Sequence, residues 1–319
     1  MMDDRGEGRA LELMVEADEA GLRLDVFLVK RVEGLGRAGA KRVIAEGRVR
    51  VDGRVRRKGA MLSPGETVSL EGEPEIAEFD PLPDEAIPLR VVFEDEDFLV
   101  VDKPAGVPCH PLRPSERGTL ANAIAARYPE AIPHGHHRRE AGLLQRLDNQ
   151  TSGLLLVARS LRGFEELGRM LATGAVDKRY KALCVGAVRA PQRIDLDVGH
   201  DARDRRKMRA VTELEAGEVR HPRQATTEIL HSEVRGDRSL VELRVRAARR
   251  HQVRVHLAAL GHPLVGDTLY GGPAIEGLDR HFLHASALSF RHFRTGEELA
   301  FASPLPPELE DVLAAAGFR

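Results

Sequence analysis

Charge is segregated along this chain, and the segregation constrains the chain to a modular organisation. Between residues 22 and 60, twelve basic residues face four acidic ones, a net charge of +8. Between residues 71 and 97, eleven acidic residues face Arg90 alone, a net charge of −10. This separation predicts a basic module that contacts a polyanion, followed by an acidic linker. A basic face that is merely solvated is the alternative interpretation.

The length of 319 residues is sufficient for two or three domains. We expect an N-terminal tail at 1–20, the basic module at 21–71, a proline-containing acidic linker at 72–88 and a larger domain at 89–319. No apolar run approaches the ~18 residues that span a bilayer, and the acidic start of the chain is unlike a signal peptide. We therefore expect a cytoplasmic protein without membrane contact, in which Cys109 and Cys184 are reduced.

The basic module has the pattern of two short helices and a hairpin. Apolar residues recur at helical spacing over 24–32, and a second helix is expected to end at Gly47. Residues 48–51 alternate, Asp52-Gly53 is a favoured two-residue turn, and 54–56 return as a strand. These elements predict a small α/β module.

The remaining chain contains more predicted strands than helices, at irregular spacing. Strands are expected near 89–93, 98–101, 154–158, 176–185, 225–232 and 240–247, and helices near 119–128, 160–174 and 250–260. Irregular alternation favours an α+β fold, with a mixed, largely antiparallel central sheet flanked by helices, over a repeating βαβ barrel.

Several common chemistries lack their signatures. The chain has no Gly-rich phosphate loop, no Cys-x-x-Cys pair and no Gly-x-Ser-x-Gly segment. His134, His136 and His137 could suggest metal-assisted hydrolysis, but a second pair of ligands at helical spacing is missing. We expect neither a metal nor a cofactor.

The basic module resembles the S4 RNA-binding domain. The resemblance rests on Leu22-Arg23-Leu24-Asp25, on Gly47-Arg48-Val49-x-Val51-Asp52-Gly53 and on Pro64-Gly65-Glu66. It implies that the second helix and the hairpin lie on RNA phosphates. The residues expected to make these contacts are Arg37, Lys41, Arg42, Arg48 and Arg50.

The larger domain resembles pseudouridine synthases of the large-ribosomal-subunit uridine type. The central match is Leu144-Gln145-Arg146-Leu147-Asp148-Asn149-Gln150-Thr151-Ser152-Gly153, followed by a leucine run. Further matches, in family order, are Lys103-Pro104-Ala105-Gly106, Gly118-Thr119-Leu120, Lys178-Arg179-Tyr180-Lys181-Ala182, His251-Gln252-Val253-Arg254-Val255-His256-Leu257 and Gly266-Asp267-x-Leu269-Tyr270-Gly271. The resemblance implies that Asp148 is the essential carboxylate, that Tyr180 lies in the active site and that Arg254 pairs with Asp148.

Taken without the resemblance, each of these residues has a structural interpretation. Asp148 would be a turn residue, Tyr180 a packing residue of a strand and Arg254 a surface residue of a helix. With it, an ionised Asp148 suits a reaction that detaches uracil from ribose and rejoins it through carbon. Arg254 would offset the burial that otherwise raises the pKa of a carboxyl group. Tyr180 would stack on a flipped uracil.

The expected function is therefore the isomerisation of specific uridines in RNA to pseudouridine. Large-subunit ribosomal RNA is the favoured substrate, Arg146 is a further expected RNA contact, and no obligate protein partner is implied. The alternatives are a transfer-RNA-directed synthase and a catalytically silent RNA-binding or ribosome-assembly factor. Gln145 and the Ala247-Ala248-Arg249-Arg250 segment depart from the usual family pattern.

Overall fold

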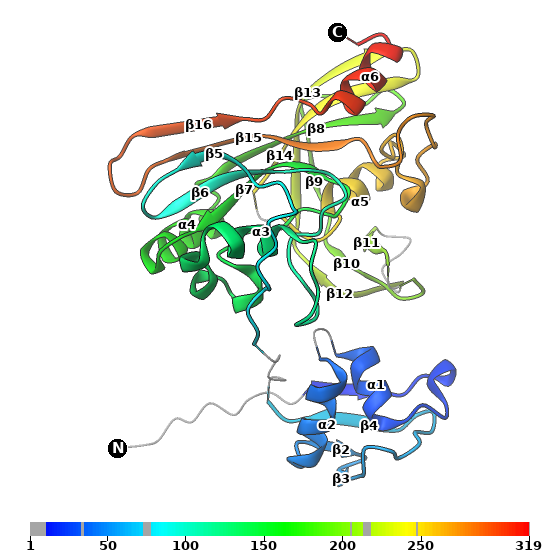
Figure 1. The fold of residues 1–319 in the computed structure, drawn as a ribbon. Coiled ribbons are helices and arrows are strands. Elements are labelled where there is room, and N and C mark those ends of the chain that lie inside the picture. Colours follow the sequence, from blue (N-terminus) through cyan, green and yellow to red (C-terminus); the bar gives the residue numbers. More distant parts are fainter. Residues whose placement is uncertain are drawn as a thin grey trace, which may run out of the picture. The chain divides into compact units, whose positions relative to one another are not determined.

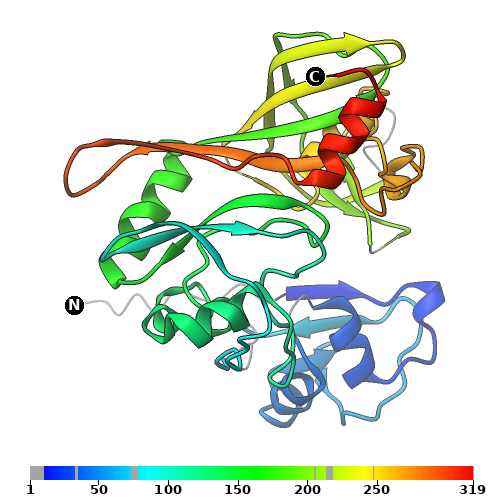
Figure 2. The same ribbon diagram turned by 45° about the horizontal axis from the view of Figure 1, so that its top comes forward.

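The chain folds into two compact units, Met1–Glu78 and Phe79–Arg319 (Figures 1 and 2). The computed structural model describes residues 11–32, 35–72, 78–204, 206–212, 218–246 and 248–318. The division falls within the segment 72–88, whose proline and acidic residues predict a linker. No helix of the described residues is long and apolar enough to cross a bilayer.

The first unit combines two short helices with a four-stranded sheet. Its elements are β1 (Leu11–Met14), the 3-10 helix η1 (Ala17–Glu19), α1 (Leu24–Arg31), α2 (Arg37–Ala45), β2 (Val49–Val51), β3 (Arg54–Val55) and β4 (Thr67–Leu70), and the strand order is β1-β4-β2-β3. Asp52 and Gly53 have φ angles of 48° and 74°. Two positive φ angles are typical of the type I′ turn, which matches the twist of a hairpin. The predicted pair of helices and the hairpin are confirmed.

Strand β1 lies in the segment that the sequence assigns to a tail at 1–20. Leu13 and Val15 are buried in the core of the first unit, and β1 pairs antiparallel with β4 from Leu11↔Leu70 to Met14↔Thr67. The expected tail is therefore corrected for residues 11–20, while residues 1–10 lie outside the described part. Only two side chains of this segment reach the core, so its apolar pattern is too short to identify a strand.

The second unit is built on a nine-stranded sheet. Its strands are β5 (Arg90–Glu94), β6 (Phe98–Lys103), β7 (Ser152–Ala158), β8 (Asp177–Val185), β9 (Gln192–Asp195), β13 (Thr226–Arg235), β14 (Arg238–Val245), β15 (Leu283–Arg291) and β16 (Glu298–Ala302). The order is β5-β6-β7-β15-β8-β14-β13-β9, with β16 paired to β15. Among the described strands, β7 and β15 run parallel and the other neighbours antiparallel. The predicted mixed, largely antiparallel sheet is confirmed.

The other elements surround this sheet. They are α3 (Leu120–Arg127), η2 (Pro129–His134), η3 (Arg138–Glu140), α4 (Leu161–Thr173), α5 (Gln252–Ala259), η5 (Thr268–Tyr270), α6 (Pro307–Ala315) and a three-stranded sheet, β11-β10-β12, of β10 (Val198–Asp201), β11 (Met208–Ala210) and β12 (Val219–Arg223). Helix α4 begins at Ser160, whose hydroxyl accepts a hydrogen bond from Gly163 N, and ends at Gly174 with φ of 74°. Both ends agree with the sequence-based prediction.

Side-chain alternation buries both faces of the large sheet. In β6, Leu99 and Val101 pack with α3, whereas Phe98 and Val100 point to the other face and pack with α4. In β8, Tyr180 and Ala182 pack with α5, whereas Leu183 packs with α6. The helices therefore cover opposite faces of the sheet, which fixes the face of β8 that carries Tyr180.

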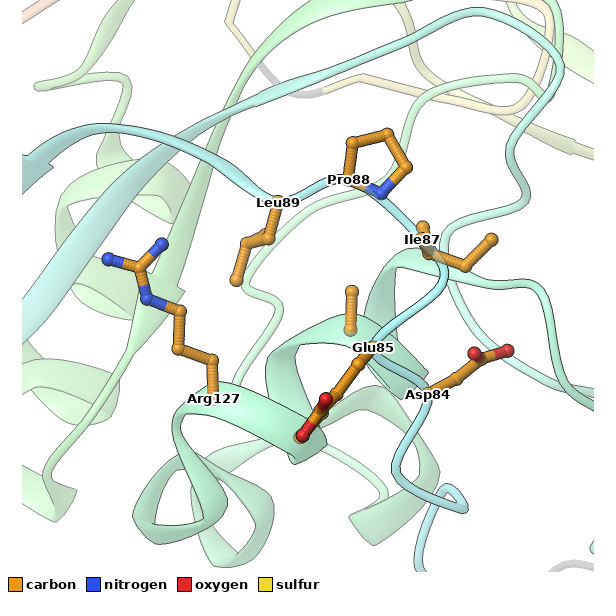
Figure 3. A pocket seen from close by; sticks show the side chains of 8 residues that line it. Asp84, Glu85, Ile87, Pro88, Leu89 and Arg127 are labelled. Carbon is orange, nitrogen blue, oxygen red and sulfur yellow. The ribbon is translucent and has the colours of Figure 1, made fainter.

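The described end of the acidic segment packs along the second unit. Leu82 O accepts a hydrogen bond from Asn122 Nδ2 at 2.7 Å, and Asp80 pairs with Arg138. A pocket of about 320 Å³ is lined by residues of this segment and of α3, namely Asp84, Glu85, Ile87, Pro88, Leu89, Ala123, Ala126 and Arg127 (Figure 3). The Asp84 carboxylate accepts hydrogen bonds from Gly118 N and Ala86 N, so both of its oxygens are bound to backbone amides.

Candidate active site

Asp148 lies in a tight turn immediately before β7. Its backbone carbonyl accepts a hydrogen bond from Thr151 N at 2.9 Å. Gly153 has φ of 115°, and a Cβ atom there would overlap the carbonyl of Ala285 in the parallel strand β15. Glycine is the residue that tolerates this backbone conformation and this close approach. The turn that carries Asp148 is thereby anchored to the centre of the sheet.

Arg254 lies in the first turn of α5 and links two carboxylates. Its Nη1 donates to Asp148 Oδ2 at 3.0 Å, and its Nε and Nη2 donate to the two oxygens of Asp267 at 2.7 and 2.8 Å. The guanidinium carbon lies 5.0 Å from the centre of the Tyr270 ring. The side chain is buried, so the predicted ion pair exists and the surface interpretation of Arg254 is wrong.

These contacts determine the charge of Asp148. Burial acts to raise the pKa of this carboxyl group, but attraction from neighbouring cations outweighs it and lowers the pKa below the ordinary value. At neutral pH the cation responsible is Arg254, because burial lowers the pKa of the nearby His251 to about 4 and leaves that ring neutral. Asp148 is therefore an ionised carboxylate with 20% of its side chain exposed.

Tyr180 shares a cleft with this ion pair. Its side chain is 7% exposed, and burial raises the pKa of its hydroxyl, which stays protonated. The cleft has a volume of about 50 Å³ and is lined by Arg146, Leu147, Asp148, Thr151, Tyr180, Val245, Ala248, Arg249, His251, Gln252, Val253, Arg254 and Leu283. The structure thus brings together the three residues predicted to be catalytic, from a loop, a strand and a helix.

The pocket in Figure 3 is larger than this cleft, but the cleft is the better candidate for a reaction. It combines a buried ion pair, a shifted carboxyl pKa and an aromatic ring, a combination that favours an active site. Of the two acids in the larger pocket, Asp84 already accepts hydrogen bonds from backbone amides, and Glu85 has no hydrogen-bonded partner among the described residues that would make it a reacting group.

Comparison with protein families identifies both units. Residues 97–259 match the RNA pseudouridylate synthase family, and residues 22–68 match the S4 domain. A ribosomal large subunit pseudouridine synthase D of Vibrio parahaemolyticus is 34% identical over 92% of this chain and 91% of its own length. The chain belongs to the RNA pseudouridine synthase family. This synthase is an isomerase that converts uridine in RNA to pseudouridine.

Other relatives support the same family. An uncharacterized RNA pseudouridine synthase of Chloroflexus aurantiacus is 38% identical over 98% of this synthase and 97% of its own length. The solved structure of human RNA pseudouridylate synthase domain containing 1 matches with a TM-score of 0.53 and 27% identity, covering 74% of this chain and 97% of that one. The comparisons therefore agree with the fold and with the resemblance carried by the motifs.

Lys103 joins the loop after β6 to the Asp148 turn of the synthase. Its Nζ donates to the carbonyls of Pro104 and Val107 at 2.8 Å each and to that of Asn149 at 3.1 Å. Gly106 N donates to the same Asn149 carbonyl at 2.8 Å. Burial lowers the pKa of Lys103 to about 8. The lysine therefore cross-links the residue that follows Asp148 to the Lys103-Pro104-Ala105-Gly106 loop.

Replacing Lys103 by methionine should loosen this turn. The variant Lys103→Met leaves the part-buried carbonyls of Pro104 and Val107 without this donor, whereas the Asn149 carbonyl keeps Gly106 N. An unsatisfied buried group costs about 1–3 kcal/mol. We expect a lower free energy of unfolding in urea and a lower turnover number. Lys181→Met, at an exposed position of β8, is the matched control. Equal stability of the two variants would contradict a structural role for Lys103.

The residues expected to contact RNA differ in their exposure and in their partners within the protein. On α2, Arg37, Lys41 and Arg42 occupy exposed positions. Arg48 Nε donates to the Glu71 carbonyl at 3.0 Å, and Arg50 pairs with the Glu71 carboxylate at 3.0 Å. Arg146 is exposed at the cleft, next to the Asp148 turn.

The two cysteines, the histidine cluster and the 247–250 segment are also singled out by the sequence. Cys109 and Cys184 are both buried and are not joined to each other in the structure. Within the described residues, no group of three or more His, Cys, Asp or Glu side chains is arranged to hold a metal, and His136 packs against Phe164. Of the unusual 247–250 segment, Ala247 lies outside the described residues, and Ala248 and Arg249 line the cleft.

Four residues without a predicted individual role also contribute to the site: Lys103, His251, Asp267 and Tyr270. All four lie within the motifs that carry the family resemblance, and the structure places three of them around Arg254 and one beneath the Asp148 turn. Their position within those motifs is the sequence signal that could have identified them as site residues. Which of them contact one another depends on the fold.

Proposed function

We propose that this pseudouridine synthase modifies uridines of large-subunit ribosomal RNA and that Asp148 is its essential carboxylate. The observation that carries the catalytic part is the Asp148–Arg254 ion pair in the cleft beside Tyr180. The substrate part is supported by relatives named ribosomal large subunit pseudouridine synthase, such as that of Vibrio parahaemolyticus. In this proposal, residues 21–71 bind RNA and residues 89–319 catalyse the reaction.

Asp148 is proposed to act on the ribose or the base as an anion. Arg254 holds one carboxylate oxygen, Oδ2, while the second oxygen, Oδ1, lies 3.9 Å from His251 Nε2. Because Asp267 binds the other side of the same guanidinium through two hydrogen bonds, Arg254 is fixed before substrate arrives. A preorganised cation of this kind keeps a buried carboxylate ionised without a change of geometry during the reaction.

Tyr180 is proposed to contact the flipped uracil. Tyr180 lies on β8, where its backbone pairs with Leu243 of β14, and its ring packs in the core on one face of the sheet. An aromatic face contributes about 1–3 kcal/mol to the binding of a stacked base.

The basic helix α2 is proposed to bind RNA phosphates. Arg37 and Lys41 are four residues apart and share one face of the helix. Log affinity falls linearly with log salt concentration. If each side chain neutralises one phosphate, the double variant Arg37→Gln/Lys41→Gln should make this slope less steep by about 1.4–1.8. Filter binding over a salt series measures this. Arg235→Gln/Arg291→Gln, with the same charge change in the second unit, should leave the slope unaltered.

Pseudouridine mapping tests the proposed substrate. Carbodiimide-dependent primer-extension stops are compared in ribosomal and transfer RNA from cells with and without this gene, and from cells that express Asp148→Asn. We expect stops to disappear from large-subunit ribosomal RNA and not to return with the variant. Loss in transfer RNA alone would identify a transfer-RNA synthase. Unchanged stops in all RNAs would favour a silent assembly factor.

A further inference from the structure

His251 faces the same carboxylate as Arg254, from the beginning of the same helix. It precedes α5 with left-handed backbone angles, φ of 55° and ψ of 14°. Histidine is among the few residues other than glycine that are enriched in this region. The side chain is 11% exposed and lines the cleft, and its Nε2 lies 3.9 Å from Asp148 Oδ1. Arg254 binds the other oxygen, Oδ2.

Hydrogen bonds at Tyr270 favour one of the two ring nitrogens of His251 as the site of the proton. The backbone N–H of Met208, in β11, donates to the Tyr270 oxygen at 2.8 Å, and His251 Nδ1 lies 2.7 Å from the same oxygen. Burial raises the pKa of Tyr270 to about 12, so its hydroxyl keeps a proton at neutral pH. Met208 N–H can only donate to this oxygen, so among the hydrogen bonds of the described residues Nδ1 is the acceptor available to the hydroxyl proton. A neutral histidine that accepts through Nδ1 carries its own proton on Nε2.

The Nε2–H group and Asp148 Oδ1 therefore flank one position in the cleft. Their separation of 3.9 Å is too long for a hydrogen bond between them. A nucleotide bound between two groups at this separation can present different atoms to them, a hydrogen-bond acceptor to the Nε2–H and the reacting part to Oδ1. One side of that position is an anion, and the other is a neutral donor, because burial lowers the pKa of His251 to about 4.

We infer that His251 is a catalytic residue that donates its Nε2–H to a carbonyl oxygen of uracil as the base leaves the ribose. Tyr270 is its positioning residue. The inference rests on the proposed role of Asp148 and goes beyond it. When the N1–C1′ bond breaks, its electron pair stays with uracil, and negative charge spreads to the carbonyl oxygens. The C5–C1′ bond then forms, C5 releases its proton and N1 gains one.

His251 keeps its proton throughout these steps. Its hydrogen bond strengthens while uracil is anionic, so the interaction favours the transition state over the bound substrate. The effect is therefore expected on turnover more than on substrate binding.

Steady-state kinetics of the full chain test the donor role. His251→Leu should lower kcat by about 10²–10³-fold, as removal of a preorganised donor does, with KM changed less than about twofold. His251→Gln supplies an amide N–H near the position of Nε2 and should recover at least about tenfold of that loss. His231→Leu, at an exposed position of β13, is the matched control. Full kcat in His251→Leu, or equal loss in the leucine and glutamine variants, would overturn the inference.

The proton position is measured independently of activity. Ring ¹⁵N spectra of protein labelled at histidine should assign His251, by its absence in His251→Gln, as protonated on Nε2. Tyr270→Phe keeps the ring beside Arg254 but removes the hydroxyl, so the preference for Nε2 should weaken and kcat should fall. A proton on Nδ1 in the unsubstituted protein would overturn the inference. An active Asp148→Asn variant would instead refute the proposed function on which it rests.

Discussion

Asp148→Asn should abolish pseudouridine formation while leaving the fold and the RNA affinity intact. Asparagine has nearly the same shape and still offers an oxygen to Arg254 Nη1, but it carries no negative charge. Removal of the central group of an active site lowers turnover by at least about 10⁴-fold. Tritium release from RNA labelled at C5 of uridine measures turnover, and filter binding measures affinity.

The control for this variant is Asp237→Asn, which alters a carboxylate that is 90% exposed. It should retain normal turnover. Thermal unfolding verifies that Asp148→Asn is folded. If Asp148→Asn released tritium at more than a few per cent of the normal rate, another group would have to perform the chemistry.

Arg254→Gln should inactivate the synthase at neutral pH by a different route. Without the guanidinium, burial dominates the environment of Asp148 and its pKa rises above the ordinary value of 3.8. The acid limb of the pH profile of kcat/KM should therefore move to higher pH by about 1–3 units. Arg254→Lys retains a positive charge and should show a smaller displacement, although an ammonium cannot reproduce the two-sided geometry.

Arg254→Gln should also lower the free energy of unfolding. Removal of one partner from a buried ion pair costs about 3–5 kcal/mol, because the remaining charges are uncompensated. In the unsubstituted protein the depressed pKa of Asp148 stabilises the fold above the ordinary value of 3.8, and this stability is lost as the pH falls through the folded-state pKa. In Arg254→Gln the penalty should be largest at neutral pH and shrink toward pH 4. A penalty independent of pH would contradict the ion-pair explanation.

The local elements of this protein are largely determined by sequence pattern. Asp52-Gly53 specifies its hairpin, Ser160 and Gly174 delimit α4, and the alternation of β6 requires cover on both faces of the sheet. Each of these patterns acts between near neighbours in the chain, where propensity and periodicity are strongest. The segregation of charge likewise indicates two modules, because it depends only on the order of charged residues along the chain.

The residue types of the candidate site could also be predicted, although through the family resemblance of their motifs. Asp148, Tyr180 and Arg254 lie in three separate segments, and pattern alone made Arg254 a surface residue. Its burial follows from the Asp267 carboxylate, thirteen positions later, which satisfies two of its donors. Without that partner a guanidinium would not be buried.

Only the tertiary structure decided which groups meet. Lys103 reaches the Asn149 carbonyl across 46 positions, and Met208 N reaches the Tyr270 hydroxyl across 62. Hydrogen bonds between distant segments depend on strand order and register, which the periodicity of one segment does not encode. The sequence by itself determined the modules, the local elements and the chemical groups available. The three-dimensional fold determined the ionisation of Asp148 and the orientation of His251, because both depend on burial and on partners from other strands and helices.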